Sequence, residues 1–237
     1  MNSIEKDNSS SKIIIFDFDE TLVHSKDMFN NVNRRAMEKM GFAHTEDIVK
    51  NLFAWVKKKY IGWGKNLEEQ ITIYDNEYSN LVTELSNQEE FLSQVYFYDG
   101  MIEVIKMLAK TDYKLAIASS RDLYSILAIL QRNKLNTYFS TVKATEGGKN
   151  FKDKPDPQII NHISDELNAK SENVVMIGDT SSDIKMGKSA GMKTIGIGYG
   201  EYTSVEKIKE YSPDAVVESV KDIKNIPFMV ANVLKSR

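Results

Sequence analysis

Two aspartates stand two residues apart, directly after a short apolar run near the N-terminus, in the order Asp17-Phe18-Asp19. An aspartate carboxylate can attack phosphorus and form an acyl-phosphate that water later hydrolyses. A second carboxyl group beside it can protonate the leaving oxygen and then accept a proton from water. Asp17 and Asp19 are therefore candidates for a nucleophile and an adjacent general acid and base. Taken alone, the pair is more typical of an acidic turn that faces solvent.

A second polar cluster, Ser119-Ser120-Arg121-Asp122, follows another apolar run. Small hydroxyls and backbone N–H groups at the start of a helix form a natural cradle for phosphate. Ser119 and Ser120 are therefore candidate phosphate-binding residues. The alternative is that one of these serines is only the N-cap of the following helix.

A lysine beside a proline marks a third cluster, Lys152-Asp153-Lys154-Pro155-Asp156-Pro157. A fixed cation could neutralise an anionic substrate and the charge of the transition state. Lys154 is better restrained than the competing candidate Lys152, because it directly precedes a proline. A plain surface turn is the alternative.

The fourth cluster, Gly178-Asp179-Thr180-Ser181-Ser182-Asp183, follows a further apolar run. Mg²⁺ prefers a few carboxylate or carbonyl oxygens together with water and substrate phosphate. Asp179 and Asp17 could supply such oxygens. The alternative is a capped helix start with Asp183 at the positive end of the helix dipole.

The elements that must position these clusters are short, β-branched apolar runs separated by helical stretches. Continuous rather than alternating apolar runs are typical of strands buried on both faces of a parallel sheet. The strands are expected at 13–16, 114–118, 174–177, 194–197 and 215–217. The helices are expected at 100–110, 122–135, 157–169 and 181–190. This alternation predicts a doubly wound α/β core, in which the four clusters converge outside the carboxyl ends of the strands.

The stretch between the first two strands is too long for a simple crossover, which needs only about a dozen residues. Residues 26–95 instead carry amphipathic helical stripes, of which Met28, Val32, Ala36 and Met40 form the first. We predict an inserted helical domain at 26–95, and a catalytic core formed by 1–25 and 96–237. Aromatic and lysine side chains of the insert could supply substrate specificity: Trp55, Lys57 to Lys59, Tyr60, Trp63 and Lys65.

Composition excludes several functional classes. The net charge of -3 provides no excess of positive charge for binding nucleic acid. Cysteine is absent, which removes disulfides, thiolate metal sites and cysteine nucleophiles. The polar first eleven residues lack the apolar run of a signal peptide, and no apolar run is long enough to span a bilayer. We expect a cytoplasmic protein that binds neither membrane nor nucleic acid, as a monomer or a homodimer.

Together, the four clusters resemble the haloacid dehalogenase (HAD) superfamily of phosphohydrolases over nearly the whole chain. The matching motifs are Asp17-x-Asp19-x-Thr21, Ser119, Lys154 and Gly178-Asp179-x-x-x-Asp183, in that order. The resemblance implies a Rossmann-like core with an inserted α-helical cap, and Mg²⁺ as cofactor. The position of the insert is similar to that in the branch of phosphoglycolate phosphatase and β-phosphoglucomutase.

The resemblance also implies a role for each motif residue. Asp17 would be the nucleophile and a metal ligand, and Asp19 would be the acid and base whose backbone carbonyl binds the metal. Asp179 would bind Mg²⁺ directly, and Asp183 would bind or orient the metal shell. The residues expected to bind the substrate phosphate are Thr21, Ser119, Ser120 and Lys154.

Two positions depart from that branch, which usually has Gly at the position of Glu20 and Asp at that of His24. The run from Asp19 to Ser25 instead resembles phosphoprotein phosphatases that act on the polymerase C-terminal tail. The leading hypothesis is a phosphatase of a small phosphomonoester, such as phosphoglycolate, a sugar phosphate or a nucleotide. A phosphomutase, a phosphoprotein phosphatase and a non-catalytic binding module are the alternatives.

Overall fold

The computed structural model describes residues 10–39, 76, 79–200 and 203–235. The chain divides into two compact units, Met1–His24 with Phe97–Arg237, and Ser25–Tyr96. All four polar clusters of the sequence belong to the first unit.

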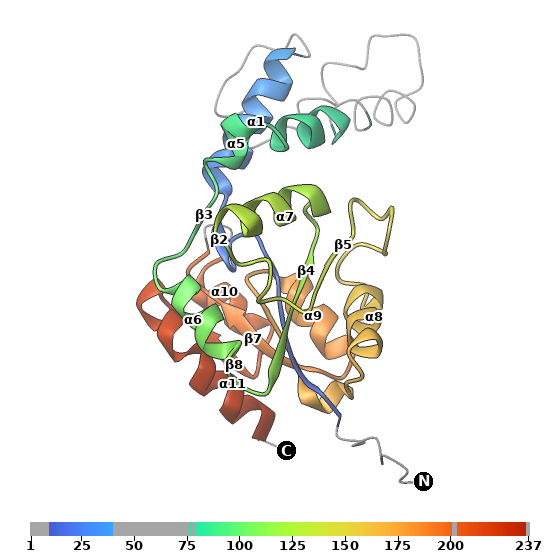
Figure 1. The fold of residues 1–237 in the computed structure, drawn as a ribbon, viewed down its shortest axis with the longest axis vertical. Coiled ribbons are helices and arrows are strands. Elements are labelled where there is room, and N and C mark those ends of the chain that lie inside the picture. The colour runs from blue at the N-terminus through green and yellow to red at the C-terminus, as the bar shows by residue number, and fades with distance from the viewer. Residues whose placement is uncertain (1–9, 40–75, 77–78, 201–202, 236–237) are drawn as a thin grey trace, which may run out of the picture. The chain divides into compact units, whose positions relative to one another are not determined.

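The first unit is built on a six-stranded parallel sheet in the order β5-β4-β1-β6-β7-β8 (Figure 1). Its strands are β1 (Lys12–Phe16), β4 (Tyr113–Ser119), β5 (Thr141–Ala144), β6 (Val174–Gly178), β7 (Lys193–Ile197) and β8 (Ala215–Val217). The chain leaves β1 for β4 on one side and later returns to β6 on the other. This order places a topological switch point at the central strand, where α/β sheets bind their ligands. The predicted α/β fold class is confirmed.

Helices cover both faces of this sheet. They are α6 (Met101–Leu108), α7 (Leu123–Arg132), α8 (Gln158–Glu166), α9 (Ser181–Ser189), α10 (Val205–Glu210) and α11 (Ile226–Lys235), with 3-10 turns η1 (Ser171–Asn173) and η2 (Val220–Asn225). On one face, α11 contacts β6 and β7 and packs beside α6, whereas α8 lies on the opposite face (Figure 1). The side chains from Ile13 to Phe16 are wholly buried. Cover on both faces explains why the strand is apolar throughout.

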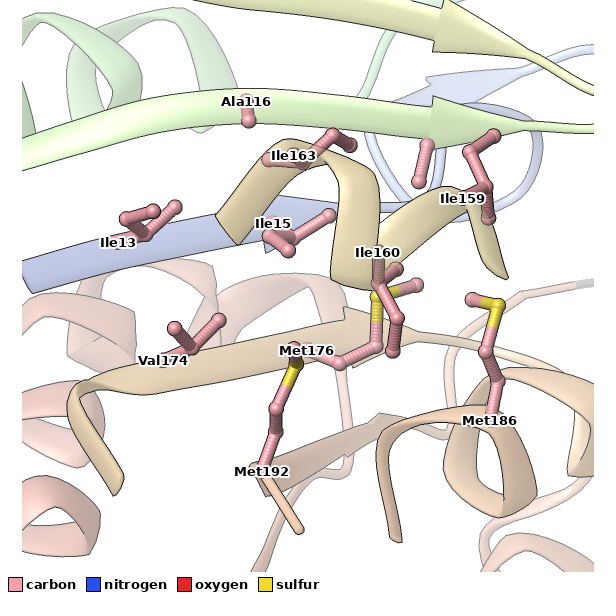
Figure 2. Close-up of a cluster of buried hydrophobic side chains, with 11 residues drawn as sticks. Ile13, Ile15, Ala116, Ile159, Ile160, Ile163, Val174, Met176, Met186 and Met192 are labelled. Atoms are coloured by element: carbon pink, nitrogen blue, oxygen red, sulfur yellow. The ribbon is translucent and has the colours of Figure 1, made fainter. Parts of the chain in front are cut away.

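Figure 2 shows the hydrophobic cluster on the α8 face of the sheet. Ile159, Ile160 and Ile163 lie one helical turn apart or less, so α8 presents them together to the strands. Alternate residues of β1 and β6, including Ile15 and Met176, belong to the same cluster. Burying this apolar area holds the central strands in place, and the polar side chains at the strand ends with them.

The sequence did not predict β5, α10 or α11 of the first unit. The strand β5 is short, and its Lys143 breaks the apolar pattern. It pairs only with β4 at the edge of the sheet, where Lys143 reaches Glu166 at 2.7 Å. The helices α10 and α11 were also missed. The N-cap alternative for Ser119 and Ser120 is wrong, because α7 is capped by Asp122, whose side chain accepts a hydrogen bond from Ser125 N at 2.9 Å.

In the second unit the structure describes α1 (Lys26–Lys39), helical residues 79–86 and α5 (Glu89–Leu92). Met28, Val32 and Ala36 are buried, as their helical spacing predicts. Met40, the stripe through Ile48, Leu52 and Val56, and the proposed specificity residues Trp55 to Lys65 lie outside the described residues. Two short strands, β2 (Val23–His24) and β3 (Tyr96–Phe97), pair with each other at the boundary of the units.

Within 10–39, 79–200 and 203–235, no helix combines the length and the apolar character needed to cross a bilayer.

Candidate active site

Three of the polar clusters meet because their strands are neighbours. In the sheet, Phe16 of β1 is paired with Ile117 of β4 on one side and with Ile177 of β6 on the other. Asp17, Ser119 and Asp179 therefore emerge at the same edge. They open into a cavity of about 280 Å³ lined by Asp17, Asp19, Ser119, Ser120, Lys154, Asp179, Thr180, Ser182 and Asp183.

Lys154 brings the third cluster into this cavity. Its Nζ atom donates to Asp17 Oδ1 at 2.5 Å and to Asp183 Oδ1 at 2.8 Å. The Lys154 side chain is only 7% exposed. The competing Lys152 is 72% exposed and lies 3.4 Å from Asp156 on the surface. A buried cation between two carboxylates is costly to build, since all three groups lose their hydration. The structure therefore puts Lys154, and not Lys152, where a substrate anion could be bound.

Three buried carboxylates, Asp17, Asp179 and Asp183, each offer an oxygen within 4.8 Å of the others. Asp183 is fixed by a capping box: its Oδ2 accepts from Thr180 N and Oγ1, and its own N–H returns a bond to Thr180 Oγ1. Asp179 differs. Its Oδ2 is buried and has no hydrogen-bond partner among the described residues. A buried carboxylate oxygen without a donor fits a hard divalent cation such as Mg²⁺.

Two glycines keep this carboxylate group compact. A Cβ atom on Gly178 would come within 2.4 Å of the Asp183 side chain. A Cβ atom on Gly200 would come within 2.9 Å of the Glu20 carbonyl and 3.2 Å of Asp179 Oδ2. Any side chain at these positions would displace the carboxylates or the loop that carries Asp19.

Burial and mutual repulsion disfavour the ionised form of these carboxylates. Burial, followed by repulsion from Asp17 and Asp183, raises the pKa of Asp179 to about 9. Burial also raises the pKa of Asp17 to about 7, against the attraction of Lys154. Burial alone would lower the pKa of Lys154, but attraction to Asp17 and Asp183 outweighs it and holds that pKa above its usual range. When all three carboxylates are ionised, the single lysine leaves an excess negative charge that a divalent cation would neutralise.

Comparison with known proteins agrees with this arrangement. Residues 14–197 match the family model described as haloacid dehalogenase-like hydrolase. This range contains all four polar clusters and most of the chain. The chain belongs to the haloacid dehalogenase-like hydrolases.

Similar proteins are hydrolases of phosphorylated compounds by name. Pyrophosphatase PpaX of Listeria innocua is 26% identical over 89% of this chain and 93% of its own length. Pyrophosphatase PpaX of Halalkalibacterium halodurans is 32% identical, but the match spans only 54% of this chain and 59% of that protein. A phosphorylated carbohydrates phosphatase of Thermotoga maritima is 28% identical over 94% of this chain and 97% of its own.

A solved structure from Clostridium acetobutylicum, described as a predicted phosphatase, has the same fold. It superimposes with a TM-score of 0.73 at 21% identity, covering 93% of this chain and all of that one. At this identity the likeness shows the fold alone. The expected HAD-like subgroup and the hydrolase class are confirmed by the family match and the relatives together.

Most of the residues predicted for this HAD-like hydrolase line the cavity, but Thr21 does not. Thr21 is wholly buried, and its hydroxyl lies 3.5 Å from Asp17 Oδ2 and 3.4 Å from Asp179 Oδ1. Its hydroxyl therefore faces the carboxylates. Ser119 is buried and accepts a hydrogen bond from Arg121 N at 3.1 Å, so its own proton can still be donated to a ligand. Ser120 is exposed at the cavity rim.

Sequence reasoning missed three residues of the site. Thr180 and Ser182 also line the cavity. The Thr180-x-x-Asp183 spacing of a capping box was a readable signal for the first of them. The third is Arg121, which holds Asp19 with three hydrogen bonds. No spacing in the sequence connects two residues that lie on different loops.

Glu20 has a structural role that its neighbours explain. It adopts a left-handed conformation with φ of 56°, a region in which glycine is most at ease. Its side chain is wholly buried and accepts a hydrogen bond from the Tyr98 hydroxyl at 2.7 Å. The Tyr199 hydroxyl donates to the Thr21 carbonyl at 2.7 Å, and its ring packs edge-on against Tyr98 at 4.7 Å. The two tyrosines thus brace the loop that carries Asp19.

His24 lies outside the cavity lining and packs edge-on against the Tyr98 ring at 6.0 Å. Burial, and then the hydrogen bond to Glu20, raise the pKa of Tyr98 far above its usual range. The Tyr98 hydroxyl is therefore a permanent donor to Glu20.

Replacing Tyr98 with phenylalanine should lower the free energy of unfolding. The change removes a donor to a buried carboxylate while keeping the ring, so the expected loss is about 1–3 kcal/mol. The measurement is urea unfolding of both proteins. Tyr124→Phe is the matched control, because the Tyr124 side chain is 66% exposed. It should change the free energy of unfolding by less than about 0.5 kcal/mol. An equal change in the free energy of unfolding for the Tyr98 variant and the control would contradict the role of Tyr98 in holding the Asp19 loop.

Stability of the metal-free protein should fall as pH rises from about 4 to about 9. Asp179 and Asp17 have folded-state pKa values above those of the unfolded chain, so over this range the folded protein holds protons that the unfolded chain has released. Mg²⁺ would bind the carboxylates in their ionised form, so we expect its stabilising effect to grow over the same range. The measurement is the melting temperature with Mg²⁺ and with EDTA at several pH values. A Mg²⁺ effect that does not change with pH would contradict this reading of the carboxylate group.

Proposed function

We propose that this HAD-like hydrolase is a Mg²⁺-dependent phosphatase of small phosphorylated metabolites that works through an aspartyl-phosphate on Asp17. The observation that carries the proposal is the buried group at the strand ends, in which Lys154 joins Asp17 to Asp183. Beside it lies Asp179 Oδ2, which has no hydrogen-bond partner in the part of the chain that the structure describes. A purely structural ion pair has no use for a third buried carboxylate or for an adjoining polar cavity.

The reaction has two half-steps that exchange one phosphoryl group. An Asp17 carboxylate oxygen attacks phosphorus, the bond from phosphorus to the leaving oxygen breaks, and Asp19 gives that oxygen a proton. Water then attacks the phosphorus of the aspartyl-phosphate, Asp19 takes a proton from it, and Asp17 and inorganic phosphate are released. Lys154 and the Ser119 hydroxyl balance the negative charge that spreads over the phosphoryl oxygens.

Asp17, Asp179 and the backbone carbonyl of Asp19 would hold the metal ion, and Asp183 would bind or orient the metal shell and keep Lys154 in place. When bound, Mg²⁺ supplies positive charge next to the phosphoryl group. Thr21 lies between the Asp17 and Asp179 carboxylates, so we assign it to positioning them rather than to binding phosphate.

Residues 26–95 are proposed to act as a cap domain that selects the substrate. The compact unit Ser25–Tyr96 supports a separate fold for this insert. The predicted substrates are phosphomonoesters. Relatives named pyrophosphatase add inorganic pyrophosphate as a second candidate.

The test is a panel of phosphorylated metabolites, p-nitrophenyl phosphate, a phosphopeptide and pyrophosphate, assayed for released phosphate with Mg²⁺ or with EDTA. We expect hydrolysis with Mg²⁺ and none with EDTA. Rearranged sugar phosphate without free phosphate would show a mutase instead. Preferential hydrolysis of the phosphopeptide would show a phosphoprotein phosphatase. No turnover of any compound would contradict the proposal.

A further inference from the structure

Arg121 is a deeply buried charge beside the cavity that the reaction described above does not use. Its side chain is 1% exposed, and it belongs to the loop that follows β4. Its Nη2 atom donates to Asp19 Oδ1 at 2.7 Å, and its Nε atom donates to both Asp19 oxygens at 3.1 Å. A guanidinium group that meets a carboxylate with two nitrogens fixes its orientation as well as its position.

The backbone of Arg121 is itself held on both sides. Its N–H donates to Ser119 Oγ at 3.1 Å. The next residue, Asp122, is the N-cap of α7 and accepts hydrogen bonds from the N–H and the hydroxyl of Ser125. The guanidinium group is therefore anchored to the end of β4 and the start of α7.

The two Asp19 oxygens are held unequally. Oδ1 accepts the short bond from Nη2 and a share of the Nε donor, whereas among the described residues Oδ2 accepts only the shared Nε contact. A carboxylate oxygen has two lone pairs, so Oδ2 keeps more capacity for a further partner. The Asp19 side chain is 19% exposed, and Asp19 lines the cavity.

We propose that Arg121 is a positioning residue for Asp19, which fixes the carboxylate by Oδ1 and leaves Oδ2 to exchange protons with the leaving group and with water. The inference rests on the proposed phosphatase function and adds to it the residue that orients its acid and base. Proton transfer needs the donor atom within hydrogen-bond reach of the leaving oxygen, and a small displacement is costly.

The test compares kcat/KM for two substrates in the full chain with Mg²⁺. The p-nitrophenolate leaving group needs little protonation, whereas the alcohol of an alkyl phosphate such as glycerol phosphate needs a proton. Arg121→Met should lower kcat/KM for the alkyl phosphate by about 10²-fold. For p-nitrophenyl phosphate the loss should be several-fold smaller. Arg121→Lys should recover part of the loss, because lysine restores one charged hydrogen-bond donor but not the contact through two nitrogens.

A double-mutant cycle separates positioning from general damage. In the Asp19→Asn protein, Arg121→Met should cause no further change in the ratio of the two kcat/KM values. Arg132→Met is the matched control: it makes the same substitution at an exposed arginine, the last residue of α7, and should leave that ratio unchanged.

The proposal is overturned by an equal loss on both substrates, by a full effect of Arg121→Met in the Asp19→Asn protein, or by a changed ratio in Arg132→Met. If Arg121→Met does not fold, Arg121→Lys is put through the same cycle with the same criteria. Failure of the wild-type protein to hydrolyse either substrate would instead contradict the proposed function. The two claims therefore fail by different results.

Discussion

Asp17→Asn should abolish hydrolysis of p-nitrophenyl phosphate, with a loss of about 10⁴-fold or more in kcat. The amide nitrogen and oxygen of asparagine are too weakly nucleophilic to accept a phosphoryl group. The covalent intermediate therefore cannot form at this residue. The side chain keeps nearly the same shape. Lys154 keeps its partner Asp183, at 2.8 Å, so the protein should remain folded.

The control for this variant is Asp112→Asn. Asp112 lies on the surface with its side chain 68% exposed and pairs with Lys12 at 2.7 Å, away from the cavity lining. Its replacement should leave kcat within about twofold, because an exposed ion pair contributes little to stability and nothing to the chemistry. The measurement is steady-state release of p-nitrophenolate, together with the melting temperature of each protein. Activity above background in a folded Asp17→Asn protein would refute the covalent mechanism.

Lys154→Met should damage both stability and activity. The variant leaves Asp17, Asp179 and Asp183 buried together without a cation, and breaking a buried ion pair by removing one partner typically costs about 3–5 kcal/mol. Loss of the charge that balances the phosphoryl oxygens should lower kcat by about 10²–10³-fold. Added Mg²⁺ should restore part of the stability but not the activity, because it neutralises the carboxylates without replacing the lysine.

Lys152→Met is the matched control, since it removes the same side chain two residues away on the surface. It should change the free energy of unfolding by less than about 0.5 kcal/mol and leave kcat unchanged. The measurements are chemical unfolding with and without Mg²⁺, and phosphate release. Similar behaviour of the two methionine variants would mean that the buried lysine does not act as described.

The sequence predicted the central strands well because burial on both faces leaves them continuously apolar. Ile13 to Phe16 and Val174 to Ile177 are examples, and the structure buries both runs completely. The strand β5 was missed for the converse reason. An edge strand tolerates Lys143, so its pattern resembles that of a loop.

The sequence could predict those residues of the candidate site that directly follow a strand of the sheet. Asp17, Ser119 and Asp179 follow adjacent strands, so their convergence follows from the sheet. Contacts between loops do not follow from any pattern. The hold of Arg121 on Asp19, the bond from Tyr98 to Glu20, and the burial of Thr21 away from the cavity lining all required the three-dimensional arrangement.

The central claim is that Asp17 carries the phosphoryl group during turnover. The direct measurement is rapid acid quenching of the enzyme with p-nitrophenyl phosphate and Mg²⁺, followed by mass spectrometry of the peptide that contains Asp17. We predict one added phosphoryl group on that peptide, labile to hydroxylamine and absent from Asp17→Asn. A phosphoryl group on another residue, or none on a protein that is turning over, would contradict the mechanism.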